Sequence, residues 1–443
     1  MISDNASGLD LKDLSIDELS ARHPALPESL IENAVDWMEL PIHLTYLIAD
    51  KCAYIVDLIR FGAVCVCWQS VYTEIRKSRR EKSHRQPPLL MLPTEFNPDD
   101  HTRSFYSLSE KRVSQFQAQV PYNCFCQGSS YGWLVVLRED KSISLLNPFL
   151  LHNNEIQLPP LTAFERIFHG EVFHNDYMIH NDYMIKAVLS SNPLTDPDFI
   201  VMAIHGAHRT LAFCRSGDKA WTNLDSKFEQ ILDIVYHRDR FYVVDLGGEI
   251  FAFYLNHSHP IASLISPTPL HDDIPCICKY IVESSGELLQ IRRNLILDFE
   301  DEYECYFTFS FDVHKLDITL KEWVKVRSLE NQVLFLGDSS SMSLSTLDFP
   351  QYKPNCVYFT DDHHEGYFYR VYERRSWGMG PHDMGIFNLE DGKIEPYYKM
   401  ESDMIVPPPI WIEPMLMEDE PRRNDPETVG MRREENRYEI RRD

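Results

Sequence analysis

Hydrophobic residues follow a helical period between about residues 31 and 76. Leu40, Leu44, Leu47 and Ile48 recur at spacings of three and four positions, which places their side chains on one face of an α-helix. Pro41 suits the first turn of a helix, where its missing N–H costs nothing. The pattern therefore predicts a helical module in this part of the chain.

Residues 57–70 are the most apolar part of this module. Their sequence, DLIRFGAVCVCWQS, is apolar on nearly every side of a helix. One stripe contains Leu58, Phe61, Val64, Cys65 and Trp68, and outside it fall Ile59, Ala63 and Val66. A module of about 45 residues is near the size at which a domain needs help to stay folded. The excess apolar surface indicates binding to another protein, and the alternative is that the helices pack on the rest of their own chain.

From about residue 84 onward, the pattern changes to that of β-strands. Short runs rich in β-branched and aromatic residues alternate with turn signals, as in YGWLVVLRED, FIVMAIHG and NCVYFTDD. FYVVDLGGEIFAFYL predicts a hairpin in which Gly247 and Gly248 supply the positive φ angles of a two-residue turn. Asp391 and Gly392 predict another turn. The second part of the chain is therefore predicted to be a long all-β array.

A weak repeat indicates which array this is. The phrase KAWTNL at 219–224 recurs as KEWVKV at 321–326, an offset of 102 residues, which is twice the kelch-type period of about 50 residues. Residues 84–415 would then form six or seven blades of a β-propeller. The alternative is that the two tryptophan phrases match by chance.

Composition sets the remaining boundaries. We expect an acidic flexible segment at 1–30, the helical module at 31–76, a basic and proline-containing linker at 77–88, the propeller at 89–415 and a charged disordered tail at 416–443. The basic run RKSRREKSHR at 76–85 is either a nuclear import signal or the solvated end of a helix with its linker. The tandem duplication HNDYMIHNDYMI at 174–185 leaves strand faces unchanged, and we interpret it as neutral.

The charge balance narrows the classes of partner. Forty-three basic and 68 acidic side chains give a net charge of -25, which repels nucleic acid and anionic membranes. The N-terminus carries acids and no apolar run, and later apolar runs are short and broken by charge, so we expect neither a targeting peptide nor a membrane span. We expect an intracellular protein whose ten cysteines are reduced and buried.

No catalytic or cofactor motif accompanies this architecture. The chain has no Walker A loop, no GxGxxG after a strand, no GxSxG and no HExxH. Three C-x-C pairs and the sequence Asp361-Asp362-His363-His364 are interpreted as buried thiols and a solvated loop rather than as metal ligands. His205 and His208 are interpreted as turn residues. We therefore predict no metal, no cofactor and no catalytic residue.

The helical module resembles a known family. The residues that carry the resemblance are Trp37, Leu40, Pro41, Leu44, Ile48, Asp57, Arg60, Phe61, Val64, Cys65, Trp68 and Ser70. Their order and spacing are similar to the F-box, a three-helix motif that binds the Skp adaptor of cullin-RING ubiquitin ligases. Three positions depart from the pattern, with Thr45 where a second leucine is usual and Gly62 and Gln69 where arginines are usual.

The rest of the chain resembles plant F-box proteins that carry a KIB-type β-propeller. The phrases KAVLS at 186–190, LFLG at 334–337, DFP at 348–350, NCVYFTDD at 355–362, FNLEDG at 387–392 and PPPIW at 407–411 occur in the expected order. The resemblance covers about residues 37–415, and the duplication before Lys186 departs from it. The expected fold is thus mainly β, with a small N-terminal three-helix F-box followed by a propeller of six or seven blades.

The resemblance implies a non-catalytic substrate receptor. The Skp adaptor, and through it a cullin-RING ligase, would bind the F-box at Leu40, Pro41, Leu44, Ile48, Leu58, Phe61, Val64, Cys65 and Trp68. The propeller would hold a client protein that the sequence does not identify, in the nucleus, the cytoplasm or both. The alternative is a propeller that binds a small ligand, or acts as an enzyme, through its central channel, with the helices as a cap.

Overall fold

The structure is a computed structural model, and it describes a defined part of the chain. The described residues are 40–52, 55–81, 86–92, 103–118, 120–121, 124–150, 153–160, 184–206, 208–225, 227–228, 230–255, 260–266, 278–298, 305–317, 319–320, 322–337, 339–362, 383–398 and 409–414. The predicted segments 1–30 and 416–443, Trp37 and nearly all of the duplication lie outside them. The chain divides into two compact units, residues 1–53 with 57–75 and residues 54–56 with 76–443.

The first unit contains the predicted helices. They are α3 (Ile42–Lys51), α4 (Ile55–Gly62) and α5 (Val66–Glu81). The apolar stretch 57–70 is thus divided between two helices, because the chain leaves helical geometry between Gly62 and Val66. Helix α5 continues to Glu81, five residues into the stretch expected to be a linker. No helix in the described part of the chain is both long and apolar enough to span a membrane.

Gly62 explains one departure from the F-box pattern. A Cβ atom at this position would lie 2.7 Å from Cγ of the Tyr72 ring, closer than two carbon atoms approach without displacement. Helix α4 therefore ends against the aromatic ring of α5. An arginine at position 62 would require Tyr72 to move.

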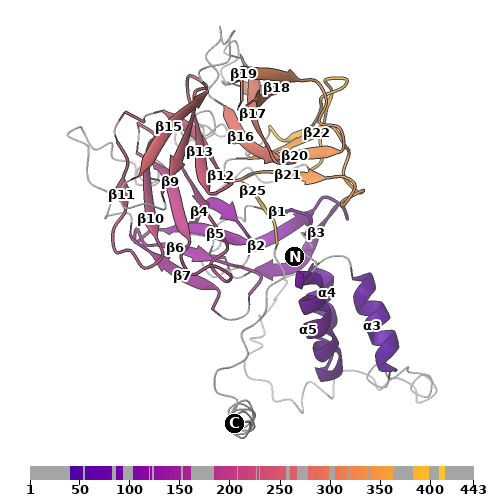
Figure 1. Ribbon diagram of the computed structural model, residues 1–443. Coiled ribbons are helices and arrows are strands. Elements are labelled where there is room, and N and C mark those ends of the chain that lie inside the picture. The colour runs from indigo at the N-terminus through magenta and orange to yellow at the C-terminus, as the bar shows by residue number, and fades with distance from the viewer. Residues whose placement is uncertain are drawn as a thin grey trace, which may run out of the picture. The chain divides into compact units, whose positions relative to one another are not determined.

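The second unit is a six-bladed β-propeller, as Figure 1 shows. From the centre outward, the first three blades are β25 (Ile410–Ile412), β1 (Leu89–Met91), β2 (Arg103–Ser107) and β3 (Arg112–Ala118); β4 (Cys124–Ser130), β5 (Trp133–Arg138), β6 (Ile143–Leu146) and β7 (Glu155–Leu158); and β8 (Lys186–Leu189), β9 (Ile200–His205), β10 (Thr210–Arg215) and β11 (Thr222–Asn223). The prediction of a mainly β fold with six or seven blades is confirmed, with six.

The remaining blades complete the ring. They are β12 (Ile231–His237), β13 (Arg240–Asp245), β14 (Ile250–Tyr254) and β15 (Ile261–Ser266); β16 (Lys279–Ser284), β17 (Glu287–Asp298), β18 (Cys305–Asp317) and β19 (Glu322–Val326); and β21 (Ser341–Ser345), β20 (Gln332–Leu336), β22 (Cys356–Phe359), β23 (Gly385–Asn388) and β24 (Ile394–Glu395). The sixth blade departs from a simple meander, because β20 and β22 pair in parallel.

The two ends of the propeller sequence meet in the first blade. Strand β25 pairs antiparallel with β1, so that Trp411 lies opposite Leu90. The buried indole of Trp411 donates a hydrogen bond to the carbonyl of Leu336 in the sixth blade, at 3.1 Å. A strand from the C-terminal part therefore closes the ring between the last blade and the first, which removes the free inner edge that an open array would have.

Apolar side chains fill the spaces between neighbouring blades. Trp133 and Phe199 lie in the cluster between the second and third blades, and Phe213 and Phe253 lie in the next one. At the ring's centre, Gly128 brings the inner strands β4 and β8 together, because a Cβ atom there would lie 2.0 Å from the carbonyl oxygen of Ala187.

The structure corrects one turn and explains the sequence repeat. Four residues connect β13 and β14, and among them only Gly248 has a positive φ, of 88°. The prediction of a two-residue turn with positive φ at both Gly247 and Gly248 is therefore wrong. Trp221 immediately precedes β11, and Trp323 lies on β19. Both are at the outermost strands of blades two apart in the ring, which accounts for an offset of two blade lengths.

Candidate functional site

Three of the predicted adaptor-binding residues form the interior of the helical module. Leu58, Phe61 and Trp68 are buried, and the rings of Phe61 and Trp68 lie with centroids 4.6 Å apart. These side chains connect α4 to α5. Their role in the isolated chain is to hold the helices together, and the prediction that they contact an adaptor stays a prediction.

The other six predicted residues are accessible to different degrees. Pro41, Leu44 and Val64 are exposed, and Leu40, Ile48 and Cys65 are partly exposed. They come from α3, from the residues just before it and from the connection between α4 and α5. These six are available to a partner without any rearrangement of the helices.

Helix α3 has an inverted distribution of side chains. It buries the small residues Thr45 and Ala49, whereas the larger Ile42 and Leu47 are each 58% exposed. The hydroxyl of Thr45 donates to the carbonyl of Pro41 at 3.4 Å, which satisfies this polar group inside the module and explains the departure from leucine. A helix that exposes its large apolar side chains is typical of a protein-binding surface.

Sequence reasoning missed three exposed apolar residues of the module. Ile42 and Leu47 were not among the predicted site residues, and Val66, which is 78% exposed, was placed outside the apolar stripe. The inverted packing of α3 could not be read from spacing alone, because a period of 3.6 residues identifies the faces of a helix but not which face is turned inward. The module's apolar surface therefore consists of Ile42, Leu44, Leu47, Val64 and Val66.

One cavity of the propeller lies where the inner strands β8, β12 and β16 begin. It has a volume of about 50 Å³ and is lined by Ile185, Lys186, Arg209, Leu232, Asp233, Cys278, Lys279, Tyr280, Gly337 and Asp362. Lys186 and Asp233 are both buried and form an ion pair of 2.5 Å. Asp233 also accepts from the backbone N–H of Ile281 at 2.9 Å. Two of the charged lining groups are thus paired with each other, and the cavity volume is well below the roughly 300 Å³ at which small-molecule sites begin.

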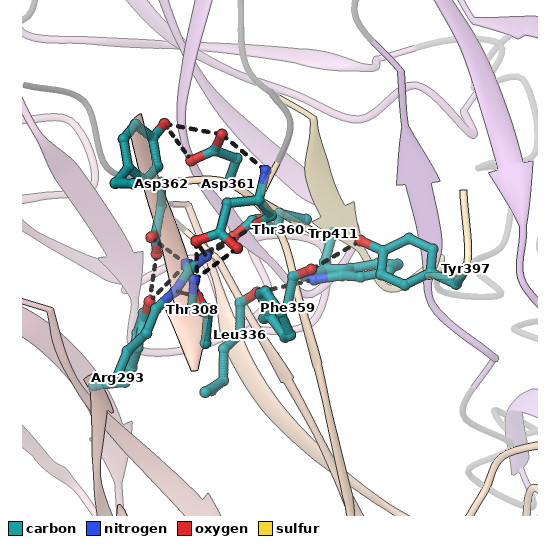
Figure 2. Close-up of polar contacts among 12 residues, drawn as sticks. Arg293, Thr308, Leu336, Phe359, Thr360, Asp361, Asp362, Tyr397 and Trp411 are labelled. Carbon is teal, nitrogen blue, oxygen red and sulfur yellow. Dashed lines mark hydrogen bonds and ion pairs between the residues drawn. The ribbon is translucent and has the colours of Figure 1, made fainter. Parts of the chain in front are cut away.

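A buried arginine dominates the polar contacts between the fifth and sixth blades (Figure 2). Arg293 on β17 is fully buried. Its guanidinium donates to Asp362 at 2.6 Å and Asp383 at 2.9 Å, and to the Thr308 hydroxyl at 2.7 Å. The cation lies 4.8 Å from the centroid of the Phe359 ring. This network fixes β17 and β18 against the sixth blade.

The electrostatics of this network keep its charges in place. Burial by itself would lower the pKa of Arg293. The combined effect of the neighbouring Tyr280, Asp362 and Asp383 is larger, and it raises the pKa of Arg293 well above its ordinary value. Burial also raises the pKa of Tyr306, and the charge of Asp361 adds to this effect. The Tyr306 hydroxyl therefore stays protonated and donates to Asp361 at 2.8 Å.

The interpretation of Asp361 and Asp362 as part of a solvated loop is wrong. Asp361 is buried and accepts a hydrogen bond from the Tyr306 hydroxyl, and Asp362 accepts one from the Arg293 guanidinium. Both lie just after β22, beyond Thr360, and serve as internal anchors. His363 and His364 lie outside the described residues. Among the residues that the structure does describe, no group of three or more histidine, cysteine or acidic side chains is placed to hold a metal ion.

The candidate histidines and cysteines have mixed environments. His205 ends β9 and is buried, and His208 lies in the following turn, so the turn interpretation holds for His208 alone. The eight described cysteines are free thiols. Cys124 and Cys126 are buried as expected, but Cys67 is exposed on α5, so the prediction of burial is wrong for this residue.

Comparison with known proteins identifies the family. The KIB1-4 β-propeller model matches residues 105–388, which is more than half of the chain. The chain belongs to the KIB1-4 β-propeller family. The resemblance to plant F-box proteins with a KIB-type propeller is thereby confirmed, because relatives from Arabidopsis thaliana match over most of their length.

These relatives match most of the chain. F-box protein SKIP23 is 26% identical over 412 residues, which covers 85% of this chain and 96% of that protein. F-box protein At2g17036 is 25% identical over 409 residues, covering 85% and 95%. A further Arabidopsis relative that is also named as an F-box protein is 28% identical over 387 residues, covering 85% and 96%.

Proposed function

We propose that this protein is the substrate-recognition subunit of an SCF-type cullin-RING ubiquitin ligase. The F-box helices α3 to α5 bind the Skp adaptor, and the propeller holds a client protein. The observation that carries the proposal is the module's apolar surface of Ile42, Leu44, Leu47, Val64 and Val66, which the module's own fold leaves exposed. The names of the Arabidopsis relatives support the same assignment.

A receptor of this kind makes no covalent bonds itself. It works by positioning, because it raises the effective concentration of client lysines near the charged ubiquitin-conjugating enzyme. A closed propeller suits this role, since it is a rigid scaffold that presents loops from all of its blades. We propose that the protein acts in the nucleus, the cytoplasm or both.

Calorimetric titration of the full chain with purified Skp adaptor tests this function. Leu44→Ser combined with Leu47→Ser removes two exposed apolar side chains from α3, and we expect adaptor binding to weaken at least tenfold, because apolar contacts at the centre of an interface supply most of its affinity. The matched control is Ile261→Ser with Leu264→Ser, which removes two exposed apolar side chains from β15 of the propeller.

Two results would argue against the proposal. One is absence of binding by the intact protein, and the other is equal weakening in both double variants. Circular dichroism of each variant establishes that it is folded. The rival function, a small-ligand or catalytic site in the central channel, gains no support from this cavity, because its volume is about 50 Å³ and its Lys186 and Asp233 pair with each other.

A further inference from the structure

The inner strands of the propeller run in the same direction. Near their beginnings, Asp233 on β12 accepts hydrogen bonds from the backbone N–H of Ile281 on β16 and from the hydroxyl of Ser341 on β21. At the other end, the hydroxyl of Tyr131, which follows β4, donates to the carbonyl of Ser190, which follows β8, at 3.3 Å. The turns that follow the inner strands therefore gather at one end of the ring, around its axis.

We call this end of the propeller the end face. It consists of the segments that follow the inner strands, and the structure describes every residue of them: 131–132, 190–199, 238–239, 285–286, 346–355 and 413–414. Three of these segments are two-residue turns in which both residues have a positive φ, the geometry of a tight hairpin. The two longer segments, 190–199 and 346–355, therefore provide most of the end face.

Each of the two longer segments holds an exposed leucine in a fixed turn. Leu194 is 40% exposed and Leu347 is 75% exposed. The backbone N–H of Leu194 donates to the side-chain oxygen of Asn192 at 3.1 Å, and that of Leu347 donates to the hydroxyl of Ser345 at 3.2 Å. The side-chain oxygen of Asn192 also accepts a hydrogen bond from the buried indole of Trp133, at 3.3 Å. The fold therefore holds both leucines in solvent.

The two leucines lie on opposite sides of the propeller axis. Leu194 belongs to the third blade and Leu347 to the sixth, and these blades are three apart in a ring of six. A partner that contacts both leucines must therefore cross the axis. Exposed apolar side chains on rigidly held loops are typical of protein-binding surfaces, and this arrangement favours an extended segment that lies across the end face.

Tyrosines and carboxylates form one connected group on the end face. Tyr131 is 38% exposed, and Tyr236, which is partly exposed, donates to the carboxylate of Asp239 at 3.5 Å. Burial raises the pKa of Tyr236 to about 12, and the neighbouring Asp239, Tyr131 and Asp196 add to this effect. Burial also raises the pKa of Tyr131, and the charge of Glu413 adds to it. These five side chains come from four different blades and surround the axis.

The charge of the end face selects its partner. Its acids are Asp196, Asp198, Asp239, Asp348 and Glu413, and its bases are Arg238 and Lys353. Lys353 is already paired with Glu395, at 2.5 Å. The excess of carboxylates attracts a cation and repels an anion, and a protonated lysine or arginine is also attracted to the faces of tyrosine rings. Described residues of the end face therefore favour a basic partner segment.

We propose that the end face is the docking surface for the client, and that it takes an extended segment in which lysine or arginine lies between apolar side chains. The proposal rests on the proposed function, since it names the place on the propeller where a client binds. The basic side chain lies among Tyr131, Tyr236 and their carboxylates, and the apolar side chains on either side of it contact Leu194 and Leu347.

Fluorescence anisotropy with the full-length protein tests this docking surface. The probes are three labelled peptides of equal length, in which leucine alternates with lysine, leucine with glutamate, and serine with lysine. We expect the leucine–lysine peptide to bind, and the leucine–glutamate peptide to bind at least tenfold more weakly. The serine–lysine peptide has the same charge but no apolar side chain, and we expect it to bind at least threefold more weakly.

A pair of isosteric substitutions tests the carboxylates. Asp196→Asn with Asp239→Asn keeps the shape of both side chains, and we expect it to weaken binding of the leucine–lysine peptide at least tenfold. The matched control is Glu139→Gln with Asp140→Asn in the exposed turn between β5 and β6, at the opposite end of the ring. It removes the same number of charges and should change binding less than twofold. Equal weakening by the two pairs would overturn the proposal, because attraction to the acidic protein as a whole would then suffice.

A second pair of substitutions tests the leucines. Leu194→Ser with Leu347→Ser leaves the charge unchanged, and we expect binding of the leucine–lysine peptide to weaken at least fivefold. The matched control is Ile261→Ser with Leu264→Ser on the outer strand β15, which should bind this peptide as the original protein does. Circular dichroism of each variant establishes that it is folded. Unchanged binding in the Leu194 and Leu347 variant would also overturn the proposal.

Adaptor binding of the same variants separates the two proposals. We expect both end-face variants to bind the Skp adaptor as the original protein does. If the adaptor binds but peptide binding is insensitive to these substitutions, the docking surface is wrong and the receptor function stands. If the intact protein does not bind the adaptor, the receptor function fails, and with it the assignment of the bound segment to a client.

Discussion

Arg293 shows how one residue sets the geometry of two blades. Its guanidinium joins β17 to Asp362, which follows β22, and to Asp383, which precedes β23. A buried ion pair gives little net stability relative to a well-packed apolar core, but its partners become very unfavourable when left alone. Arg293 therefore specifies the arrangement of the fifth and sixth blades more than it adds to their stability.

Replacing Arg293 should destabilise the propeller strongly. Arg293→Met leaves Asp362 and Asp383 buried without their cation, and we expect the free energy of unfolding to fall by about 3–5 kcal/mol, measured by denaturant titration. The control is Lys353→Met, which removes the exposed Lys353–Glu395 ion pair of the sixth blade and should have little effect. Equal effects of the two substitutions would contradict this account of the network.

His205 gives the propeller a pH-dependent stability. Burial lowers the pKa of His205 to about 4, and a hydrogen bond with Asn223 opposes this shift in part. In the unfolded chain the pKa is about 6.5, so the unfolded state binds the proton first as pH falls. Above pH 6.5, where His205 is neutral in both states, its full contribution to the free energy of unfolding is present. This contribution is lost as pH falls towards 4, by roughly 3 kcal/mol in total.

The variant His205→Asn isolates this contribution. Between pH 6.5 and pH 4 we expect the free energy of unfolding of the variant to fall less steeply than that of the original protein, because asparagine does not titrate. Denaturant titrations at a series of pH values measure the difference between the two curves. Parallel curves would show that His205 is not the titrating group.

At the residue scale, sequence reasoning identified types of side chain better than their partners. The phrase around Asp361 and Asp362 was recognised as part of the propeller pattern, but its carboxylates were assigned to solvent. Their partners Tyr306 and Arg293 come from strands more than 50 residues away. A local pattern cannot reveal a partner that only the ring of blades brings near.

At the scale of elements, close approach of inner strands depends on Gly128. A side chain at this position on β4 would meet the carbonyl oxygen of Ala187 on β8. Backbone atoms cannot move aside as a flexible side chain does, so any larger residue forces the second and third blades apart. The conformational freedom of glycine is secondary here, because space is the constraint.

The substitution Gly128→Ala tests this packing. We expect a loss of about 1–3 kcal/mol in the free energy of unfolding, the usual cost of an extra methyl group in a well-packed interior. The control is Ser129→Ala at the neighbouring position of the same strand. A neutral Gly128→Ala would mean that the inner strands have room that the structure does not show.

Helices and strands could be predicted where the hydrophobic period was clear. The prediction failed where a single residue interrupted that period. The three helices and most strands follow from spacings visible in the sequence. The break between α4 and α5 and the bulge at Phe309 do not, because each depends on one position against a tertiary partner. The break between the two helices lies beside the surface proposed for adaptor binding, where local rules are most often overridden.

At the scale of the whole molecule, closure of the ring depends on β25. Its three residues pair with β1 and bury Trp411. Deleting residues 409–443 removes this strand, and we expect loss of cooperative unfolding or aggregation through the free edge of β1. Deleting 416–443 keeps β25, and we expect a melting temperature within a few degrees of the original. Similar melting of both truncations would contradict the role of β25.

The architecture was predicted well because it repeats. Two tryptophan phrases two blades apart and the ordered family phrases indicated a propeller, and the blade number could be bounded but not fixed, since loops of different length change the count. The exposed face of the β17–β18 hairpin could not be predicted, because it depends on the bulge at Phe309.

The central claim is that the intact protein joins a cullin-RING ligase through its helical module. The most direct measurement is size-exclusion chromatography with light scattering of the full chain mixed with a preassembled complex of Skp adaptor and cullin. We predict a single species with the mass of a one-to-one assembly, and its loss in the Leu44→Ser, Leu47→Ser variant. Separate elution of the intact protein and the adaptor complex would contradict the claim.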